Sequence, residues 1–123
     1  MRIPYEDNLP LVKINVIGTS TKEFKAHLDF AATRTLVPTS TAKDLQLEFD
    51  SVVQVATASG TIDLPLFRAK IGVFEKIFNT LVLCYDLPEQ APVYALLRRD
   101  ILDNFEICLN GKKKQITILE PDG

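Results

Sequence analysis

The chain has 123 residues, a length that suits a single domain spanning residues 1–123 with a core of its own. Hydrophobic residues make up 46%, charged residues 24%, and the formal net charge is −2, a balance typical of soluble globular proteins. No basic stripe favours nucleic-acid binding, and no apolar stretch approaches the roughly 20 residues of a membrane helix. The N-terminal segment lacks the continuous apolar core of a signal peptide, so we expect a cytoplasmic protein that binds neither nucleic acid nor membrane.

Strand signals dominate the first half of the chain. Residues 11–17 alternate between apolar and polar side chains, as in a half-buried strand. Two further strands are expected at residues 24–30 and 35–37. The polar residues 39–41 then supply the chemistry of a helix N-cap, and residues 42–47 are predicted to form a short helix.

The second half of the chain is also predicted to consist of strands, with one short helix. Two hairpins are expected, one turning at Ser59-Gly60 and one at Asn110-Gly111, the strongest short-range turn signal in the chain. The expected strands are residues 52–58, 61–73, 76–85, 93–97, 105–109 and 115–119, with a helix at 99–104. Many short strands without helical crossovers predict an all-β fold, either a closed β-barrel or a sandwich.

Few residues are candidates for chemistry. The single histidine, His27, excludes a site of several histidines, and Cys84 and Cys108 lie in apolar runs where reduced, buried thiols are expected. Asp29 stands out because it ends an apolar strand and is followed closely by the small residues Ala31 and Ala32. On local context alone, the favoured interpretation of Asp29 is the cap of the following turn.

Three segments together resemble the retropepsin-like aspartic proteases. The segment AHLDFAATRTLVP is similar to the family signature, in which an apolar strand precedes Asp-Thr/Ser-Gly-Ala-Ser/Thr, and Asp29 falls on the catalytic Asp. Ala32 matches the Ala and Thr33 the Ser/Thr of that signature. The segment VYALLRRDILDNFEICLN resembles the family's buried strand with Leu-Gly-Arg-Asp and a short helix, and ATASGTIDLPLF resembles its flap hairpin, with Gly60 at the tip. The resemblance extends over residues 11–119.

This resemblance implies a closed β-barrel of the acid protease fold with one or two short helices. It implies a homodimer in which Asp29 and its copy hold a water and hydrolyse an extended peptide or protein substrate, without a metal or cofactor. The active-site loop would comprise Phe30, Ala31, Ala32 and Thr33. Substrate would contact His27, Ala58, Ser59, Gly60 and Thr61. Arg99 and Asp100 would support the loops, as an internal ion pair or, alternatively, as a solvated helix start.

The departures from the family pattern lie around Asp29. Phe30 stands where the family has Thr or Ser, Ala31 where it has Gly, and Arg98 where it has the Gly before Arg-Asp. This degenerate motif leaves an alternative function open, a catalytically inactive retropepsin fold that serves as a dimerisation or peptide-binding module. A third alternative is an unrelated small β-barrel in which Asp29 only caps a turn.

Overall fold

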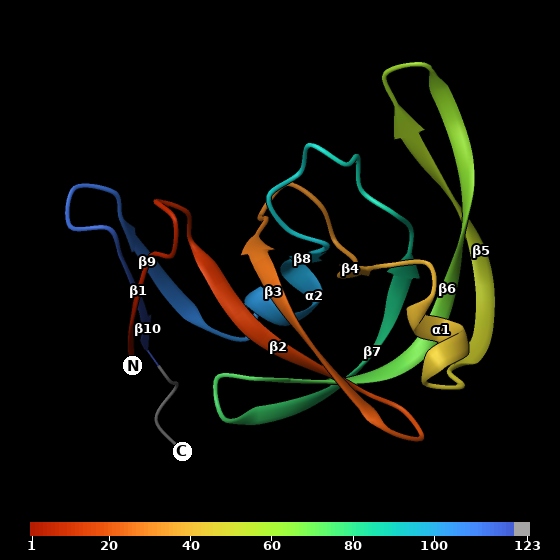
Figure 1. Cartoon of the computed structure of the whole chain (residues 1–123), viewed down its shortest axis with the longest axis horizontal. Coiled ribbons are helices and arrows are strands. Elements are labelled where there is room, and N and C mark those ends of the chain that lie inside the picture. Colours follow the sequence, from red (N-terminus) through yellow and green to blue (C-terminus); the bar gives the residue numbers. More distant parts are fainter. Residues whose placement is uncertain (120–123) are drawn as a thin grey trace.

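The structure is a computed structural model that describes residues 1–119 (Figure 1). This part of the chain contains ten strands and two one-turn helices. The strands are β1 Arg2–Pro4, β2 Leu11–Ile17, β3 Thr21–Leu28, β4 Leu36–Val37, β5 Glu48–Thr57, β6 Gly60–Val73, β7 Lys76–Cys84, β8 Ala95–Leu97, β9 Glu106–Asn110 and β10 Gln115–Leu119. The helices are α1 Thr41–Asp44 and α2 Arg99–Leu102.

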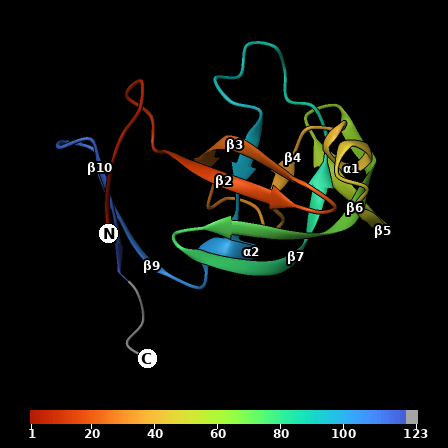
Figure 2. The ribbon, with the colours of Figure 1, turned by 60° about the horizontal axis from the view of Figure 1, so that its bottom comes forward.

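Seven strands form one sheet in the order β2-β3-β8-β4-β7-β6-β5. The sheet closes on itself because β2 also pairs with β6, where Val16 lies opposite Ile71. Strands β2, β3, β8, β4, β7 and β6 therefore form a closed barrel, and β5 extends from it as the outer strand of a long hairpin (Figures 1 and 2). The expected all-β closed barrel with two short helices is confirmed.

The barrel is filled by the apolar positions of the alternating strands. In β2, Ile14 and Val16 are fully buried while Lys13 and Asn15 are exposed, as the alternation in the sequence predicts. Ile71 of β6 and Val82 of β7 meet them inside the barrel, and Ile101 of α2 joins the same cluster. This continuous core holds the ends of β3 and β8 in fixed positions.

A second sheet of three strands, in the order β1-β10-β9, lies on the side of the barrel away from the β5–β6 hairpin (Figures 1 and 2). Ile116 and Ile118 of β10 are buried and belong to the barrel core. Strand β1 was not expected, because three residues ending in a proline carry no periodic signal. Its pairing places Ile3 opposite Ile116, so tertiary packing forms this strand.

Both helices are shorter than the sequence predicted. Helix α1 ends at Asp44, because Gln46 adopts a positive φ of 50° and leaves the helical path. The amide of Leu47 then donates to the carbonyl of Ala42 over 2.8 Å, which completes a Schellman-type end. The expected N-terminal capping is wrong, since Ser40 stands at the N-cap without a side-chain hydrogen bond. Neither helix in residues 1–119 has the length and apolar character to cross a membrane.

The turn between β2 and β3 provides a test of this packing. A Cβ added to Gly18 would lie 2.8 Å from Leu47 Cδ2 and closer still to the carbonyl oxygen of Leu45, whereas a Cβ on Gly111 would meet nothing within 4 Å. We therefore expect Gly18→Ala to lower the free energy of unfolding by about 1–3 kcal/mol, measured by urea denaturation. Gly111→Ala is the control, with an expected change below about 0.5 kcal/mol. Equal midpoints for the two variants would contradict the packing of α1 on this turn.

Candidate active site

The position of Asp29 is set by the parallel pairing of β3 with β8. His27 lies opposite Leu96 and Leu28 opposite Leu97, so both strands end at the same edge of the barrel. The amide of Asp29 continues this ladder by donating to the carbonyl of Leu97 over 2.9 Å. Asp29 and Arg98 are therefore the next residues of two neighbouring strands and project on the same side.

The two side chains form an ion pair. Arg98 Nε donates to Asp29 Oδ2 over 3.0 Å, with side-chain exposures of 15% and 22%. The other carboxylate oxygen, Oδ1, accepts the amide of Ala31 over 3.0 Å. Arg98 Nη1 also donates to the carbonyl of Arg34 over 3.3 Å. Both oxygens of Asp29 thus have a hydrogen-bond partner within the same chain.

The loop that follows Asp29 is open to solvent. Phe30 is 44% exposed, Ala31 and Thr33 are exposed, and Ala32 is half-buried. Ala31 does not adopt a positive φ, so its methyl group introduces no backbone strain. The loop therefore exposes a large apolar side chain at the residue that follows Asp29.

Asp100 anchors the far end of this loop. Its Oδ1 accepts the hydroxyl of Thr35 over 2.7 Å and the amide of Ile101 over 3.0 Å. Its Oδ2 accepts the hydroxyl of Thr80 over 2.8 Å and the amide of Thr35 over 3.2 Å. The fully buried Thr35 hydroxyl in turn accepts the amide of Arg98 over 3.1 Å. One carboxylate therefore joins the loop, β7 and α2.

Arg99 binds the same loop from outside. Its Nη2 donates to Thr33 Oγ1 over 3.0 Å and its Nε to the carbonyl of Ala32 over 3.4 Å. The ion pair expected between Arg99 and Asp100 is wrong, because among the described residues each bonds to the loop instead of to the other. The amide of Asp100 donates to the carbonyl of Thr33 over 2.8 Å.

An apolar row extends from His27 across the outer face of the barrel. Strand register places five side chains side by side on this face, from β3, β8, β4, β7 and β6 in turn: His27, Leu96, Leu36, Leu83 and Leu66. The leucines pack with Val53, Val55 and Ile62 of the β5–β6 hairpin. Asp29 lies two residues after His27 and so on the same face, which places its carboxylate next to the His27 end of this row.

The hairpin expected to cover the site extends beyond the barrel (Figure 1). Ala58 and Ser59 form its turn, Gly60 has a φ of 127°, and these residues and Thr61 are all exposed. Thr57 Oγ1 donates to the carbonyl of Gly60 over 2.7 Å and closes the turn.

His27 hydrogen-bonds through Nδ1 to the carbonyl of Leu28 over 2.8 Å, which places the proton on Nδ1. Within residues 1–119, no hydrogen bond joins the hairpin tip to His27 or Asp29.

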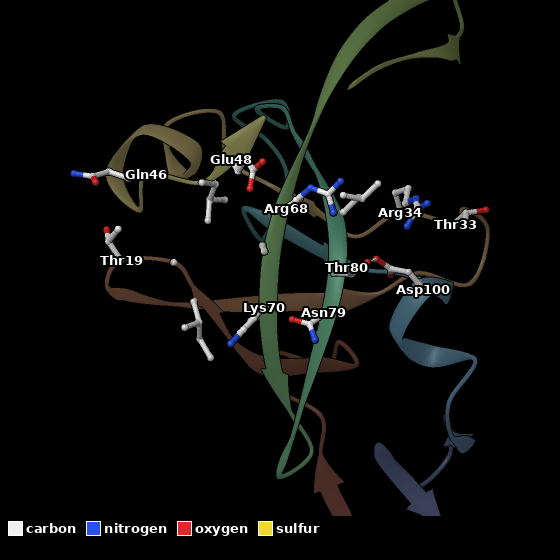
Figure 3. A pocket seen from close by; sticks show the side chains of 15 residues that line it. Thr19, Thr33, Arg34, Gln46, Glu48, Arg68, Lys70, Asn79, Thr80 and Asp100 are labelled. Carbon is white, nitrogen blue, oxygen red and sulfur yellow. Dashed lines mark hydrogen bonds between the residues drawn. The ribbon is translucent and has the colours of Figure 1, made fainter. Parts of the chain in front are cut away.

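A cavity of about 940 Å³ lies between strands β6 and β7, the β2–β3 turn and the end of the loop at Thr33 and Arg34 (Figure 3). Residues 68–70 of β6 and 79–81 of β7 contribute to its lining, with Thr33, Arg34 and Asp100 at one end. Asp29 is not among its lining residues, so the volume of this cavity does not mark the candidate active site.

The two cysteines differ from the expectation in one respect. Cys84 is buried, and burial raises the pKa of its thiol to about 11, so the thiol is protonated at neutral pH. Cys108 is exposed, contrary to the expectation, because it lies on the outer face of β9 opposite Thr117. Both thiols are free.

Comparison with known proteins identifies the fold. No protein-family model and no curated protein sequence matches the chain. Among solved structures, the EIAV protease bound to an inhibitor superposes with a TM-score of 0.59 at 19% identity, covering 82% of this chain and 92% of that one. The chain has the fold of the retropepsin-like aspartic proteases.

Two further structures agree with this fold. A retropepsin-like aspartic protease from Rickettsia conorii superposes with a TM-score of 0.58 at 14% identity, over 94% of this chain and 86% of that one. The protease of simian foamy virus (mac) superposes with a TM-score of 0.52 at 24% identity, over 72% and 86%. At these identities the likeness shows the retropepsin fold alone.

The Asp100 network generates a test of how the loop is held. In Asp100→Asn, one oxygen becomes an NH₂ group that faces donors, so two of the four hydrogen bonds are lost and polar groups remain unpaired. We expect the free energy of unfolding to fall by about 2–4 kcal/mol, measured by urea denaturation. Asp103→Asn, at an exposed position of the same segment, is the matched control and should be nearly neutral. Equal effects of the two substitutions would contradict the anchoring role of Asp100.

Proposed function

We propose that the chain is a retropepsin-like aspartic endopeptidase that acts as a homodimer, with Asp29 of each subunit forming the catalytic dyad. The observation that supports this function best is the position of Asp29. Its carboxylate lies directly after β3, two residues from His27 of the apolar row and 22% exposed, in a chain with the retropepsin fold. A single Asp at this position per chain requires a second copy to supply the other carboxylate.

The chemistry of such a dyad needs two carboxylates in close contact. Two carboxyl groups about 3 Å apart cannot both ionise comfortably, so they share one proton. The ionised Asp29 acts as general base on a water molecule, which attacks the peptide carbonyl carbon. The protonated Asp29 of the other subunit donates its proton toward the carbonyl oxygen. Collapse of the tetrahedral intermediate then breaks the C–N bond and passes a proton to the amine, and neither a metal nor a cofactor is needed.

The substrate in this proposal is an extended peptide. It would lie as an added strand between the hairpin tip, residues 58–61, and the apolar row, with backbone hydrogen bonds for affinity. Apolar substrate side chains would pack on Leu36, Leu66 and Leu83, which form one cluster on this face. His27 faces the same side and would border the bound peptide.

A second candidate function is a catalytically inactive module that dimerises or binds peptides. Two observations favour it: Phe30 has no hydroxyl with which to tie two loops together, and Asp29 is already paired with Arg98. Two exposed phenylalanines at a symmetry axis could pack on each other, which contributes roughly 0.5–1.5 kcal/mol beyond area burial. Such a dimer could hold its aspartates too far apart to share a proton.

Restoring the family motif separates the two candidates. Phe30→Thr with Ala31→Gly should raise peptidase activity, because Thr supplies the hydroxyl between the loops and Gly removes the methyl group beside the carboxylate. Positioning errors of about 1 Å can cost around 10²-fold in rate, so we expect a gain of up to about 100-fold. The measurement is cleavage of a peptide library between pH 4 and 7 at matched dimer concentration.

Two controls accompany this measurement. Asp29→Asn in the restored background should abolish activity because the amide cannot act as the base, and activity that survived would show that Asp29 is not catalytic. Phe49→Thr, at another exposed phenylalanine, should leave the activity unchanged. A well-formed dimer without activity in any variant would favour the inactive module.

A further inference from the structure

Arg98 is held firmly although it lies in a loop connection. Its guanidinium donates to Asp29 Oδ2 over 3.0 Å and to the carbonyl of Arg34 over 3.3 Å. Its amide donates to the Thr35 hydroxyl over 3.1 Å, and its side chain is only 15% exposed. The two guanidinium contacts fix the direction of the side chain, and the amide contact fixes its backbone. It is not a mobile surface arginine.

The strand register leaves Arg98 in contact with Asp29. Because β3 and β8 run parallel and end together, the residue after Leu97 stands beside the residue after Leu28. A glycine at position 98 has no side chain, so it would leave the side of the Asp29 carboxylate that faces β8 open. Arginine places a guanidinium there, and the guanidinium occupies one lone pair of Oδ2.

The Asp29–Arg98 ion pair and an Asp29 dyad make competing demands on one carboxylate. Two aspartates share a proton because the proton supplies the positive charge that lets the two oxygens approach. A guanidinium beside each carboxylate supplies that charge instead. When two Asp29–Arg98 pairs meet, each carboxylate is neutralised by its own guanidinium group, so both carboxylates can stay ionised. Neither Asp29 is then protonated, and no general acid remains for the reaction.

We propose that Arg98 is an intramolecular inhibitory latch that holds Asp29 in its own subunit and keeps the dyad from sharing a proton. This inference rests on the proposed peptidase function and adds a residue that regulates the same site. The inhibition is electrostatic: the positive charge of the side chain carries it, rather than its bulk. A neutral polar side chain should therefore release the latch, and another cation should maintain it.

The test uses the full chain in the Phe30→Thr/Ala31→Gly background. Arg98→Gln should raise kcat/KM at least tenfold over this background, whereas Arg98→Lys should stay within about threefold of it. Arg68→Gln is the matched control, because Arg68 forms the other Arg–Asp ion pair of the described residues, with Asp50 at 2.8 Å, and lies outside the loop. It should leave kcat/KM unchanged.

A measurement independent of peptidase activity tests the pair itself. Urea midpoints of Arg98→Gln, Asp29→Asn and the double variant should be non-additive, because either single substitution already removes the ion pair. Additive midpoints would overturn the latch. Because glutamine retains a polar side chain that can hydrogen-bond at this partly exposed position, failure to fold is not expected to obscure this comparison.

The outcomes separate this inference from the proposed function. If the background hydrolyses peptide in an Asp29-dependent way but Arg98→Gln brings no gain, the latch is wrong and the peptidase function stands. An equal gain from Arg98→Lys and Arg98→Gln would also overturn the latch, because charge would then not be the cause. Inactivity of every variant, including Arg98→Gln, would overturn both.

Discussion

The parallel pairing of β3 with β8 determines which side chains meet at the candidate site. It joins segments far apart in the chain, with His27 opposite Leu96, and lets both strands end at the same edge of the barrel. The next residues, Asp29 and Arg98, then face each other across 69 positions of sequence. A shift of one residue would turn Asp29 into the barrel core, where an ionised carboxylate would be costly. The site therefore depends on the core that maintains this register.

The carboxylate of Asp100 maintains the geometry at the end of that pairing. It accepts four hydrogen bonds from Thr35, Thr80 and Ile101, which belong to the loop, β7 and α2. Charge-assisted hydrogen bonds of this kind are roughly twice as strong as neutral ones, so a short loop can be held without a disulfide or a metal. The two aspartates of the site thus differ: Asp100 is enclosed by donors, whereas Asp29 faces an open surface and pairs with one cation.

Much of the fold could be predicted from the sequence, because the strands carry strong local signals. Three predicted strands correspond closely to observed ones: residues 11–17 to β2, residues 61–73 to β6 and residues 115–119 to β10. Strand β1 could not be predicted, because only its pairing with β10 makes it a strand. The early end of α1 depends on the positive φ of Gln46. Glutamine is not a residue type that predicts a positive φ, unlike glycine or asparagine.

The candidate site was predictable in part. Asp29 and its loop followed from the motif, and Arg98 was visible as a departure from the family pattern. Its ion pair with Asp29 was not foreseen, because it depends on a parallel register between distant strands that no local pattern encodes. The hydroxyls of Thr35 and Thr80 were missed for the same reason, since only the folded chain brings them to Asp100.

The central claim is that two copies of the chain bring their Asp29 loops together at a symmetry axis. The most direct measurement is disulfide formation by Phe30→Cys in a Cys108→Ser background, in which the remaining Cys84 is buried. A disulfide requires Cα atoms within about 7 Å, so it reports close approach of the two loops. Val52→Cys, at a position 55% exposed on β5, is the matched control. We expect rapid cross-linking of dimers through position 30 and little through position 52. No cross-linking at position 30, or equal rates at both positions, would contradict a dimer formed through the Asp29 loops.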